Sequence, residues 1–191
     1  MKGIVYDCEI IRCIPSRDSK STEYEYCSGW DDFGGMGISV ICAIELETDR
    51  IYTFVHPEVA HFQQLIYSVQ QTGKIAGFNS LNFDDKLCHA NGIAVNTDFD
   101  LLCEVRVAAY GSPGWEDCPK GYSYKLDAIA LNHGFAKTGS GTLAPQLWQQ
   151  GRCQEVIDYC VNDVKITKEL ILLFLDGKLK DPNNGKVLVP S

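Results

Sequence analysis

The sequence lacks three features that would each point to a particular class of protein. Its longest unbroken apolar run covers residues 170–175, far short of the roughly 20 residues that a membrane-spanning helix needs. No charged and apolar leader precedes the first strand-like segment. None of the nine cysteines forms the Cys-x-x-Cys pair typical of zinc sites, and their odd number does not suit a disulfide framework. We therefore expect a cytoplasmic protein with free thiols and no contact with a membrane.

Positive charge is also scarce. The chain carries 25 acidic and 17 basic side chains, which gives a formal net charge of −8. This balance argues against a protein that holds nucleic acid on a broad basic surface. It does not exclude an enzyme that acts on nucleic acid and gathers its acids in one metal site, because bound divalent cations reverse the local charge.

Length and composition are those of one globular domain. An apolar share of 45% and a charged share of 22% are ordinary, and 191 residues can bury a full core. We expect a single domain over residues 1–177. Residues 178–191 contain a DPNNG turn and a short apolar end, and they are expected to form a tail or a closing strand.

Two carboxylates interrupt an apolar first strand, KGIVYDCEII at residues 2–11. Side chains alternate between the two faces of a strand, so Asp7 and Glu9 should point the same way, about 6 to 7 Å apart. Such a pair repels itself and resists burial unless a cation lies between the two groups. The alternative is a strand end with two solvated acids, which is the commoner origin of an isolated Asp-x-Glu.

Strands and helices alternate in the rest of the chain. Residues 37–55 read as an antiparallel hairpin, 57–73 as a helix and 74–78 as a short buried strand. A further strand end near residues 97–102 and a long helix over residues 153–176 complete the pattern. It predicts an α/β fold: a five-stranded mixed sheet, with one antiparallel strand from the opening hairpin, flanked by helices on both faces.

Two of these helices carry further polar residues near the expected site. Asp84 falls on the first turn of a helix just past a strand's carboxyl end, where α/β sheets place their functional residues. Tyr159 and Asp163 lie four residues apart on the last helix and share one face of it. Asp158 points about 100° away on that helix and is expected to be solvated.

Four carboxylates could therefore converge from a strand, a helix start and a helix interior. They are Asp7, Glu9, Asp84 and Asp163. A set with no histidine and no thiol forms a hard, oxygen-rich site, and such a site suits magnesium or manganese.

Two loop regions are rich in aromatic residues. Residues 12–36 leave the first strand beside the expected site, either as a flap whose rings stack on bases or as a surface excursion fixed by its own aromatics. Residues 111–121 form a Gly- and Pro-rich loop, followed by a helix expected from Ser123 to Gly134 and a flexible link over 139–142. Across this region, Trp115 and several other rings lie among Lys120, Lys125 and Lys137. A solvated loop is the expected explanation of that second region, and a groove that guides a nucleic-acid strand is the alternative.

In their order along the chain, these residues resemble the three motifs of the DEDD (DnaQ-like) 3'-5' exonuclease superfamily. The matching patterns are Asp7-x-Glu9, Asn79-x-x-x-Phe83-Asp84 and Tyr159-x-x-x-Asp163. A tyrosine four residues before the last aspartate is typical of the tyrosine branch (DEDDy), whereas the other branch has histidine at the position of Asp158. The segment GFNSLNFD is most similar to the second motif of the proofreading exonuclease domain of family B DNA polymerases.

The resemblance implies an RNase H-like fold and a metal-dependent 3'-5' exonuclease. Asp7, Glu9, Asp84 and Asp163 would hold two divalent cations, Mg²⁺ or Mn²⁺, and Tyr159 would orient the attacking water. Asn79 and Phe83 would contact the terminal nucleotide, although Phe83 could instead be a core residue that holds Asp84 in place. The substrate would be the 3' end of single-stranded DNA, favoured over RNA, and the products would be 5'-mononucleotides.

No polymerase, helicase or RNA-binding domain follows the motifs in this sequence. We therefore expect a free-standing exonuclease domain, or a subunit that works with a polymerase, a helicase or another nucleic-acid-processing partner. Two other functions fit the same fold. One is a module that binds nucleic acid or protein without cutting, and the other is an endonuclease, which would accept a blocked 3' end or a circular substrate.

Overall fold

The computed structural model describes residues 1–15, 23–136, 139 and 141–190. Its centre is a single five-stranded sheet. In spatial order the strands are β3 (Ile51–Val55), β2 (Ile38–Glu45), β1 (Gly3–Ile10), β4 (Lys74–Gly77) and β5 (Phe99–Asp100). The helices are α1 (Phe33–Met36), the 3-10 helix η1 (Glu58–His61), α2 (Phe62–Gln70), α3 (Asp84–Ala90), α4 (Leu101–Tyr110), α5 (Leu126–Asn132), α6 (Ala144–Gln149) and α7 (Cys153–Leu175).

The central strand β1 carries both kinds of pairing. It pairs antiparallel with β2 and parallel with β4, while β2 pairs antiparallel with β3 and β4 pairs parallel with β5. Of these five strands, β2 alone runs against the others. The pairings confirm the mixed sheet with one antiparallel strand that the sequence predicts.

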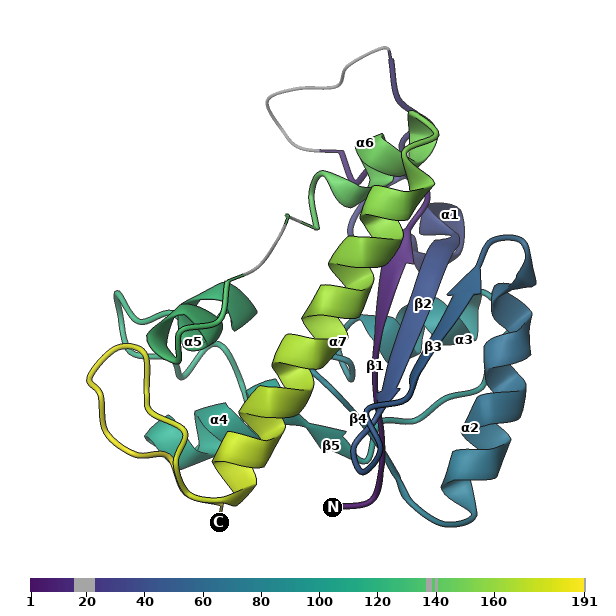
Figure 1. The fold of residues 1–191 in the computed structure, drawn as a ribbon. Helices are drawn as coiled ribbons and strands as arrows, with labels where there is room; N and C mark the ends of the chain where they lie inside the picture. The colour runs from purple at the N-terminus through teal and green to yellow at the C-terminus, as the bar shows by residue number, and fades with distance from the viewer. Residues whose placement is uncertain (16–22, 137–138, 140, 191) are drawn as a thin grey trace.

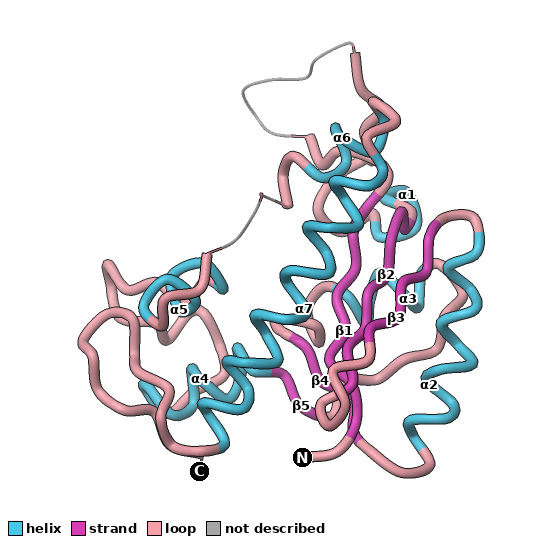
Figure 2. Tube along the Cα trace, in the orientation of Figure 1, coloured by secondary structure: helices cyan, strands magenta, loops and turns pink. Residues whose placement is uncertain are grey.

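Two apolar cores lie on opposite faces of the sheet. The side chains of β1 alternate between the two cores. Val5 packs in the core with α7, whereas Ile4, Tyr6, Cys8 and Ile10 pack in the core with α2 and α3. Figure 1 shows α7 crossing one face of the sheet with α2 and α3 on the other side, and Figure 2 shows α4 and α5 beyond the β5 edge. The expected cover of helices on both faces is thus confirmed.

Helix boundaries depart from the sequence pattern at two places. The segment after Pro57 begins as the 3-10 helix η1 before it continues as α2. Helix α6 was not predicted, although Pro145 is its second residue and proline is favoured at the start of a helix. The long last helix was predicted to within one residue of α7 at its C-terminal end.

The residues after α7 fold back onto the domain. Leu179 and Leu188 are buried, and Lys180 and Val187 form an isolated antiparallel bridge. Within the described chain, no helix combines the length and the apolar character that crossing a membrane requires. All nine cysteines are free thiols.

Candidate active site

Strand β1 places two carboxylates on the face that packs against α7. Asp7 and Glu9 lie opposite Cys42 and Val40 of β2, two residues of the core on that face. Glu9 is only 6% exposed and Asp7 is half-buried. The acids therefore point into the fold, and they are not the solvated strand end that was the alternative.

Asp84 joins this pair from the start of α3. Its carboxylate accepts a hydrogen bond of 3.0 Å from the backbone N–H of Cys8, the residue between Asp7 and Glu9. The residue is 4% exposed. Burial raises the pKa of Asp84 well above its usual value, and the negative charge of Asp7 raises it further. The structure thus holds two carboxyl groups close together, and it shields Asp84 from water.

Helix α7 supplies the remaining two residues. Tyr159 and Asp163 are 7% and 4% exposed, and the Tyr159 hydroxyl hydrogen-bonds Asp163. The pKa of Tyr159 lies far above its ordinary value, first because the ring is buried and then because Asp163, Glu9 and Asp7 are negative. Tyr159 consequently stays protonated at neutral pH, so its hydroxyl can orient a water but cannot act as a base.

A single large cavity contains every site residue named from the sequence. It has a volume of about 1350 Å³. Its lining includes Asp7, Glu9, Asn79, Phe83, Asp84, Tyr159 and Asp163. Residues separated by more than 150 positions in the sequence therefore meet on one surface. Their individual roles remain predictions.

Asn79 and Phe83 form the two ends of the turn before α3. Asn79 adopts a positive φ of 62°, a conformation that asparagine tolerates better than most residues. The Phe83 ring packs edge-on against Phe33 at 5.8 Å between centroids and is half-buried beside the α2 and α3 core. That packing fits the alternative in which Phe83 holds Asp84 in place, and the ring also reaches the cavity.

Asp100 fixes that turn from the neighbouring strand, and the sequence analysis did not single it out. Its buried carboxylate accepts backbone N–H groups of Asn79 at 2.8 Å, Leu81 at 3.1 Å and Leu102 at 3.0 Å. The last of these bonds caps the start of α4. An aspartate directly before an apolar helical run could have been identified as a helix cap, but its bonds to the Asn79 turn depend on how β4 and β5 pair.

Asp85 forms a second anchor that the sequence analysis missed. It is 6% exposed and faces away from the cavity into the core between β1 and α3. Its carboxylate accepts bonds from the Tyr6 hydroxyl, from the Thr97 N–H at 2.9 Å and from the Thr97 hydroxyl at 2.8 Å. These bonds tie the first turn of α3, and so Asp84, to the back of β1.

Replacing Asp85 with alanine is expected to lower the free energy of unfolding by about 3 kcal/mol. The change leaves the buried Tyr6 hydroxyl and two Thr97 donors without their acceptor, and unsatisfied buried donors cost about 1 to 3 kcal/mol each before relaxation. Denaturant unfolding measures the loss. Asp158→Ala on the exposed side of α7 is the matched control and should change stability by no more than about 0.5 kcal/mol. Equal stability of both variants would contradict the anchoring role.

A thiol lies beside the carboxylates, which corrects the expectation of a site without sulfur. The Cys160 Sγ is 3.5 Å from the Asp7 carbonyl oxygen and 3.7 Å from its Oδ2. Ligand atoms of Asp7, Glu9 and Cys160 all lie within 4.8 Å of one another. Burial is the main cause that raises the pKa of this thiol well above its usual value, so Cys160 stays neutral and acts as a weak donor.

The residues present fit divalent cations of the hard type. Glu9, Asp84 and Asp163 are all nearly buried, and Asp7 lies among them. Carboxylates this close are stable as anions only when opposite charge compensates their repulsion. Carboxylate oxygens are the ligands that Mg²⁺ and Mn²⁺ prefer in proteins. The charged groups that could bind a cation are therefore carboxylate oxygens, although the neutral Cys160 thiol lies at the edge of the site.

The lack of a side chain at Gly139 makes room for the Tyr159 ring. A Cβ at Gly139 would lie 2.8 Å from the ring's Cδ2, closer than real contacts allow, whereas a Cβ at Gly141 would lie 3.7 Å from the Tyr159 hydroxyl. The sequence pattern indicates only a flexible link over residues 139–142, and Ser140 within it lies outside the described residues.

If Tyr159 orients a water as the sequence predicts, Gly139→Ala should slow that reaction by displacing the ring, and Gly141→Ala should not. A Cβ at Gly141 would meet no described atom closer than 3.7 Å, so alanine at that position is the matched control. A catalytic group displaced by about 1 Å can cost about a hundredfold in rate. We expect a decrease of this order in kcat for the first variant and a change within about twofold for the second, measured on the same oligonucleotide. Equal rates for the two variants would show that the ring does not depend on Gly139.

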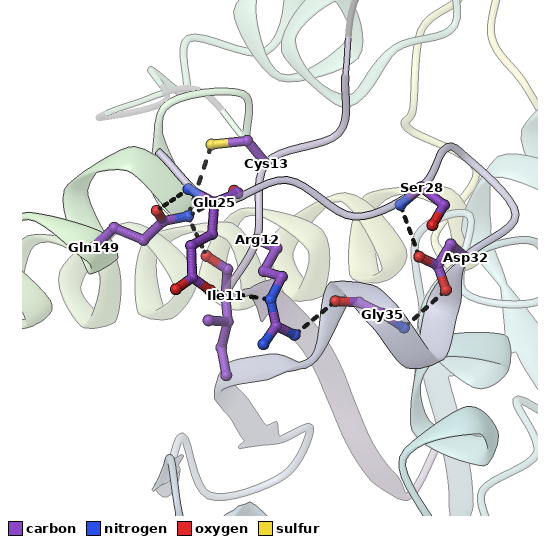
Figure 3. A network of polar contacts seen from close by, with 8 residues as sticks. All are labelled: Ile11, Arg12, Cys13, Glu25, Ser28, Asp32, Gly35 and Gln149. Atoms are coloured by element: carbon purple, nitrogen blue, oxygen red, sulfur yellow. Dashed lines mark hydrogen bonds and ion pairs between the residues drawn. The ribbon is translucent and has the colours of Figure 1, made fainter. Parts of the chain in front are cut away.

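Side chains at the end of α6 attach the segment that leaves β1, and Figure 3 shows the bonds of Gln149 among them. The Gln149 amide donates to the carbonyl oxygens of Ile11 at 2.9 Å and Glu25 at 3.1 Å, and its oxygen accepts the Glu25 N–H at 2.7 Å. Arg12 pairs with Glu25 at 3.1 Å and donates to the Gly35 carbonyl at 2.9 Å. The expected loop over residues 12–36 is thus fixed at both ends, while residues 16–22 lie outside the described part.

Comparisons with known proteins support the fold. No protein-family model matches the sequence, and no curated protein matches it. The structure is similar to that of the family B DNA polymerase from the hyperthermophilic archaeon Pyrobaculum calidifontis, with a TM-score of 0.61 at 15% sequence identity. The match covers 91% of this chain but 24% of the polymerase chain. The chain thus has an α/β, RNase H-like fold that is also found within a family B DNA polymerase.

Proposed function

We propose that this chain is a metal-dependent 3'-5' exonuclease of the tyrosine branch of the DEDD superfamily. It would remove 5'-mononucleotides from the 3' end of single-stranded nucleic acid, with DNA favoured over RNA. One observation carries the proposal: the Asp84 carboxylate bonds to the backbone between Asp7 and Glu9, in the cavity that also contains Tyr159 and Asp163.

Each residue of the site has a proposed part in this reaction. Asp7, Glu9, Asp84 and Asp163 would hold two divalent cations, with Asp7 serving both. When bound, the cations would polarise the terminal phosphodiester and lower the pKa of the attacking water. Tyr159, kept protonated by its surroundings, would hold that water in line with the scissile bond. Asn79 and Phe83 would contact the last nucleotide.

The fold likeness and the motifs support the branch that we propose. A family B DNA polymerase is one structural neighbour, and the match covers 91% of this chain. Asp158, at the position where the other branch has histidine, is exposed on α7 and hydrogen-bonds Gln154 at 2.8 Å. Tyr159, by contrast, is directed at the acids. We propose residues 1–177 as the catalytic domain, a cytoplasmic location, and a polymerase, helicase or similar protein as partner.

Short oligonucleotides test the proposal directly. Single-stranded DNA and RNA of matched sequence, labelled at the 5' end, are incubated with magnesium, with manganese and with a chelator. We expect stepwise shortening from a free 3' end in the presence of either metal, and faster shortening of DNA. A strand with a blocked 3' end and a circular strand are the controls, and both should remain intact.

Each of the other outcomes overturns the proposal in a recognisable way. Cleavage of the circular strand would indicate an endonuclease. Binding of the oligonucleotide without shortening in either metal would indicate a module that binds nucleic acid without cutting it. Shortening in the chelator would exclude the metal-dependent mechanism.

A further inference from the structure

We propose that two exposed tryptophans, Trp30 and Trp115, hold the last nucleotides of the strand by stacking, and that phosphate contacts contribute little to affinity. The inference deepens the proposed function, since it concerns how that same cavity binds an unpaired 3' end. We name Trp30 and Trp115 the tryptophan clamp.

The clamp belongs to the same cavity as the carboxylates. Trp30 is 67% exposed and Trp115 is 75% exposed, and both line the cavity of about 1350 Å³. Ligand pockets for small molecules occupy about 300 to 1,000 Å³, so this cavity exceeds the space that a single mononucleotide needs. Large exposed rings in a cavity of this size suit unpaired bases, because every base offers a flat face for stacking.

The two tryptophans come from separate regions of the fold. Trp30 precedes α1, and Trp115 lies between α4 and α5. In Figure 1, α4 and α5 form the left-hand part of the molecule, whereas α1 lies beyond α7, near α6. A strand that runs through the cavity to the acids can therefore meet rings contributed by both regions.

The segment that carries Trp30 is held in place without a ligand. Cys13 and Tyr26 form a bridge between its two ends, and the Asp32 carboxylate accepts the N–H groups of Ser28 at 2.7 Å and Gly35 at 3.0 Å. Figure 3 shows the two bonds of Asp32 in the same network as those of Gln149. The ring is thus presented by an ordered backbone, which lowers the entropy cost of binding.

The segment that carries Trp115 is anchored in the same way. Arg106 donates to the Pro113 carbonyl at 3.1 Å, and the Tyr110 hydroxyl donates to the Gly114 carbonyl at 2.8 Å. These two bonds fix the residues directly before Trp115.

The chain after α7 supports the same wall of the cavity. The Tyr124 hydroxyl donates to the buried Asp181 at 3.0 Å, and Asn183 bonds to the backbone of Ser123. Tyr122 and Tyr124, whose rings are 6.5 Å apart, both line the cavity. The C-terminal segment therefore contributes to the shape of the binding surface.

Bound divalent cations would compensate the charges of Asp7, Glu9, Asp84 and Asp163, so the remaining charges of the described lining decide how well it binds the other phosphates. The described lining contains seven carboxylates: Asp7, Glu9, Glu23, Asp84, Glu116, Asp127 and Asp163. Arg106 and Lys125 are the cations in that part of the lining, and Arg106 already donates to Pro113. Lys120 does not line the cavity, and Arg17, Lys20 and Lys137 lie outside the described residues. Stacking does not depend on charge, so it can supply affinity where phosphates meet few cations.

Alanine variants of the clamp measure the stacking. Trp30→Ala and Trp115→Ala should each raise KM for a single-stranded oligothymidylate by about fivefold to a hundredfold, the range measured for loss of one stacked base. The value of kcat should stay within about twofold, because stacking binds the substrate and the transition state equally and takes no part in the chemical step. Tyr67→Ala is the control, because Tyr67 is a 59% exposed aromatic residue of α2 that does not line the cavity. An unchanged KM in both tryptophan variants would overturn the proposal.

The salt dependence of wild-type binding provides a second readout. Each phosphate neutralised on a single strand contributes about −0.7 to the slope of log affinity against log salt. Arg106 and Lys125, the two cations of the described lining, would together contribute about −1.4 to this slope at constant magnesium. A slope of about −3.5 or steeper, which corresponds to five phosphate contacts, would contradict a clamp based on stacking.

Binding without turnover separates this inference from the proposed function. In an Asp7→Asn background, oligothymidylate quenching of tryptophan fluorescence reports affinity, and the clamp variants are compared within that background. If the wild-type protein does not cleave but these variants still lose affinity, the exonuclease is wrong and the clamp stands. If the wild-type protein cleaves and the variants bind and cleave normally, the clamp alone is wrong.

Discussion

Replacing Asp7 with asparagine is expected to lower the exonuclease rate by about a thousandfold or more. The substitution keeps the shape of the side chain and removes one negative charge from the centre of the carboxylate group. Metal ions contribute several kcal/mol to stabilising such a transition state, and each 1.4 kcal/mol corresponds to about a tenfold change in rate. The measurement is single-turnover shortening of a 5'-labelled strand in magnesium. Full activity of the variant would rule out the proposed role of Asp7 as a ligand of the catalytic cations.

In the absence of metal, the same substitution should make the folded protein more stable. In the wild-type protein, burial and the charge of Asp7 raise the pKa of Asp84, so the folded state bears a cost for its acids. Asp7→Asn relieves part of that repulsion and should raise the melting temperature in a chelator. Magnesium should then stabilise the wild-type protein, by about 2.7 kcal/mol at a hundred times Kd, and stabilise the variant much less. Loss of activity together with a lower melting temperature in the chelator would indicate simple misfolding instead.

Tyr159→Phe is expected to lower kcat by at least about a hundredfold while metal affinity changes little. Groups that position or transfer a proton contribute about 10² to 10⁴ in rate. The ring would remain in its buried place against Gly139, so the variant removes the hydroxyl and little else. Manganese titration of the folded protein gives the affinity, and initial rates give kcat. A variant that keeps its rate would remove the tyrosine from the mechanism.

The positions of three site residues followed from local patterns in the sequence. Alternation along β1 placed Asp7 and Glu9 on one face, and the structure has them there. The short apolar run of β4, followed by a turn and a helix start, placed Asp84 beyond a strand's carboxyl end. Such arguments succeed because the period of a strand and the start of a helix depend on neighbouring residues.

The supporting residues could not be derived in this way. Asp84 and Asp85 stand side by side in the sequence, yet one faces the cavity and the other bonds to Tyr6 and Thr97 behind β1. Cys160 belongs to the apolar stripe of α7, and its contact with Asp7 depends on where that helix crosses β1. Each of these contacts is set by the angle and distance between elements that are far apart in sequence, which no local pattern encodes.

Glycine positions show the same limit. The residues 139–142 read as a flexible link because glycine permits many backbone conformations. In the structure, Gly139 lies against the Tyr159 ring, and the lack of a side chain is what makes that contact possible. The close approach of the Tyr159 ring is thus a tertiary reason for glycine at this position.

Anomalous scattering from crystals soaked in manganese tests the central claim most directly. We expect two peaks within coordinating distance of carboxylate oxygens from Asp7, Glu9, Asp84 and Asp163, and weaker or missing peaks in Asp7→Asn crystals. Ordered crystals at saturating manganese with no peak among these four side chains would contradict the account.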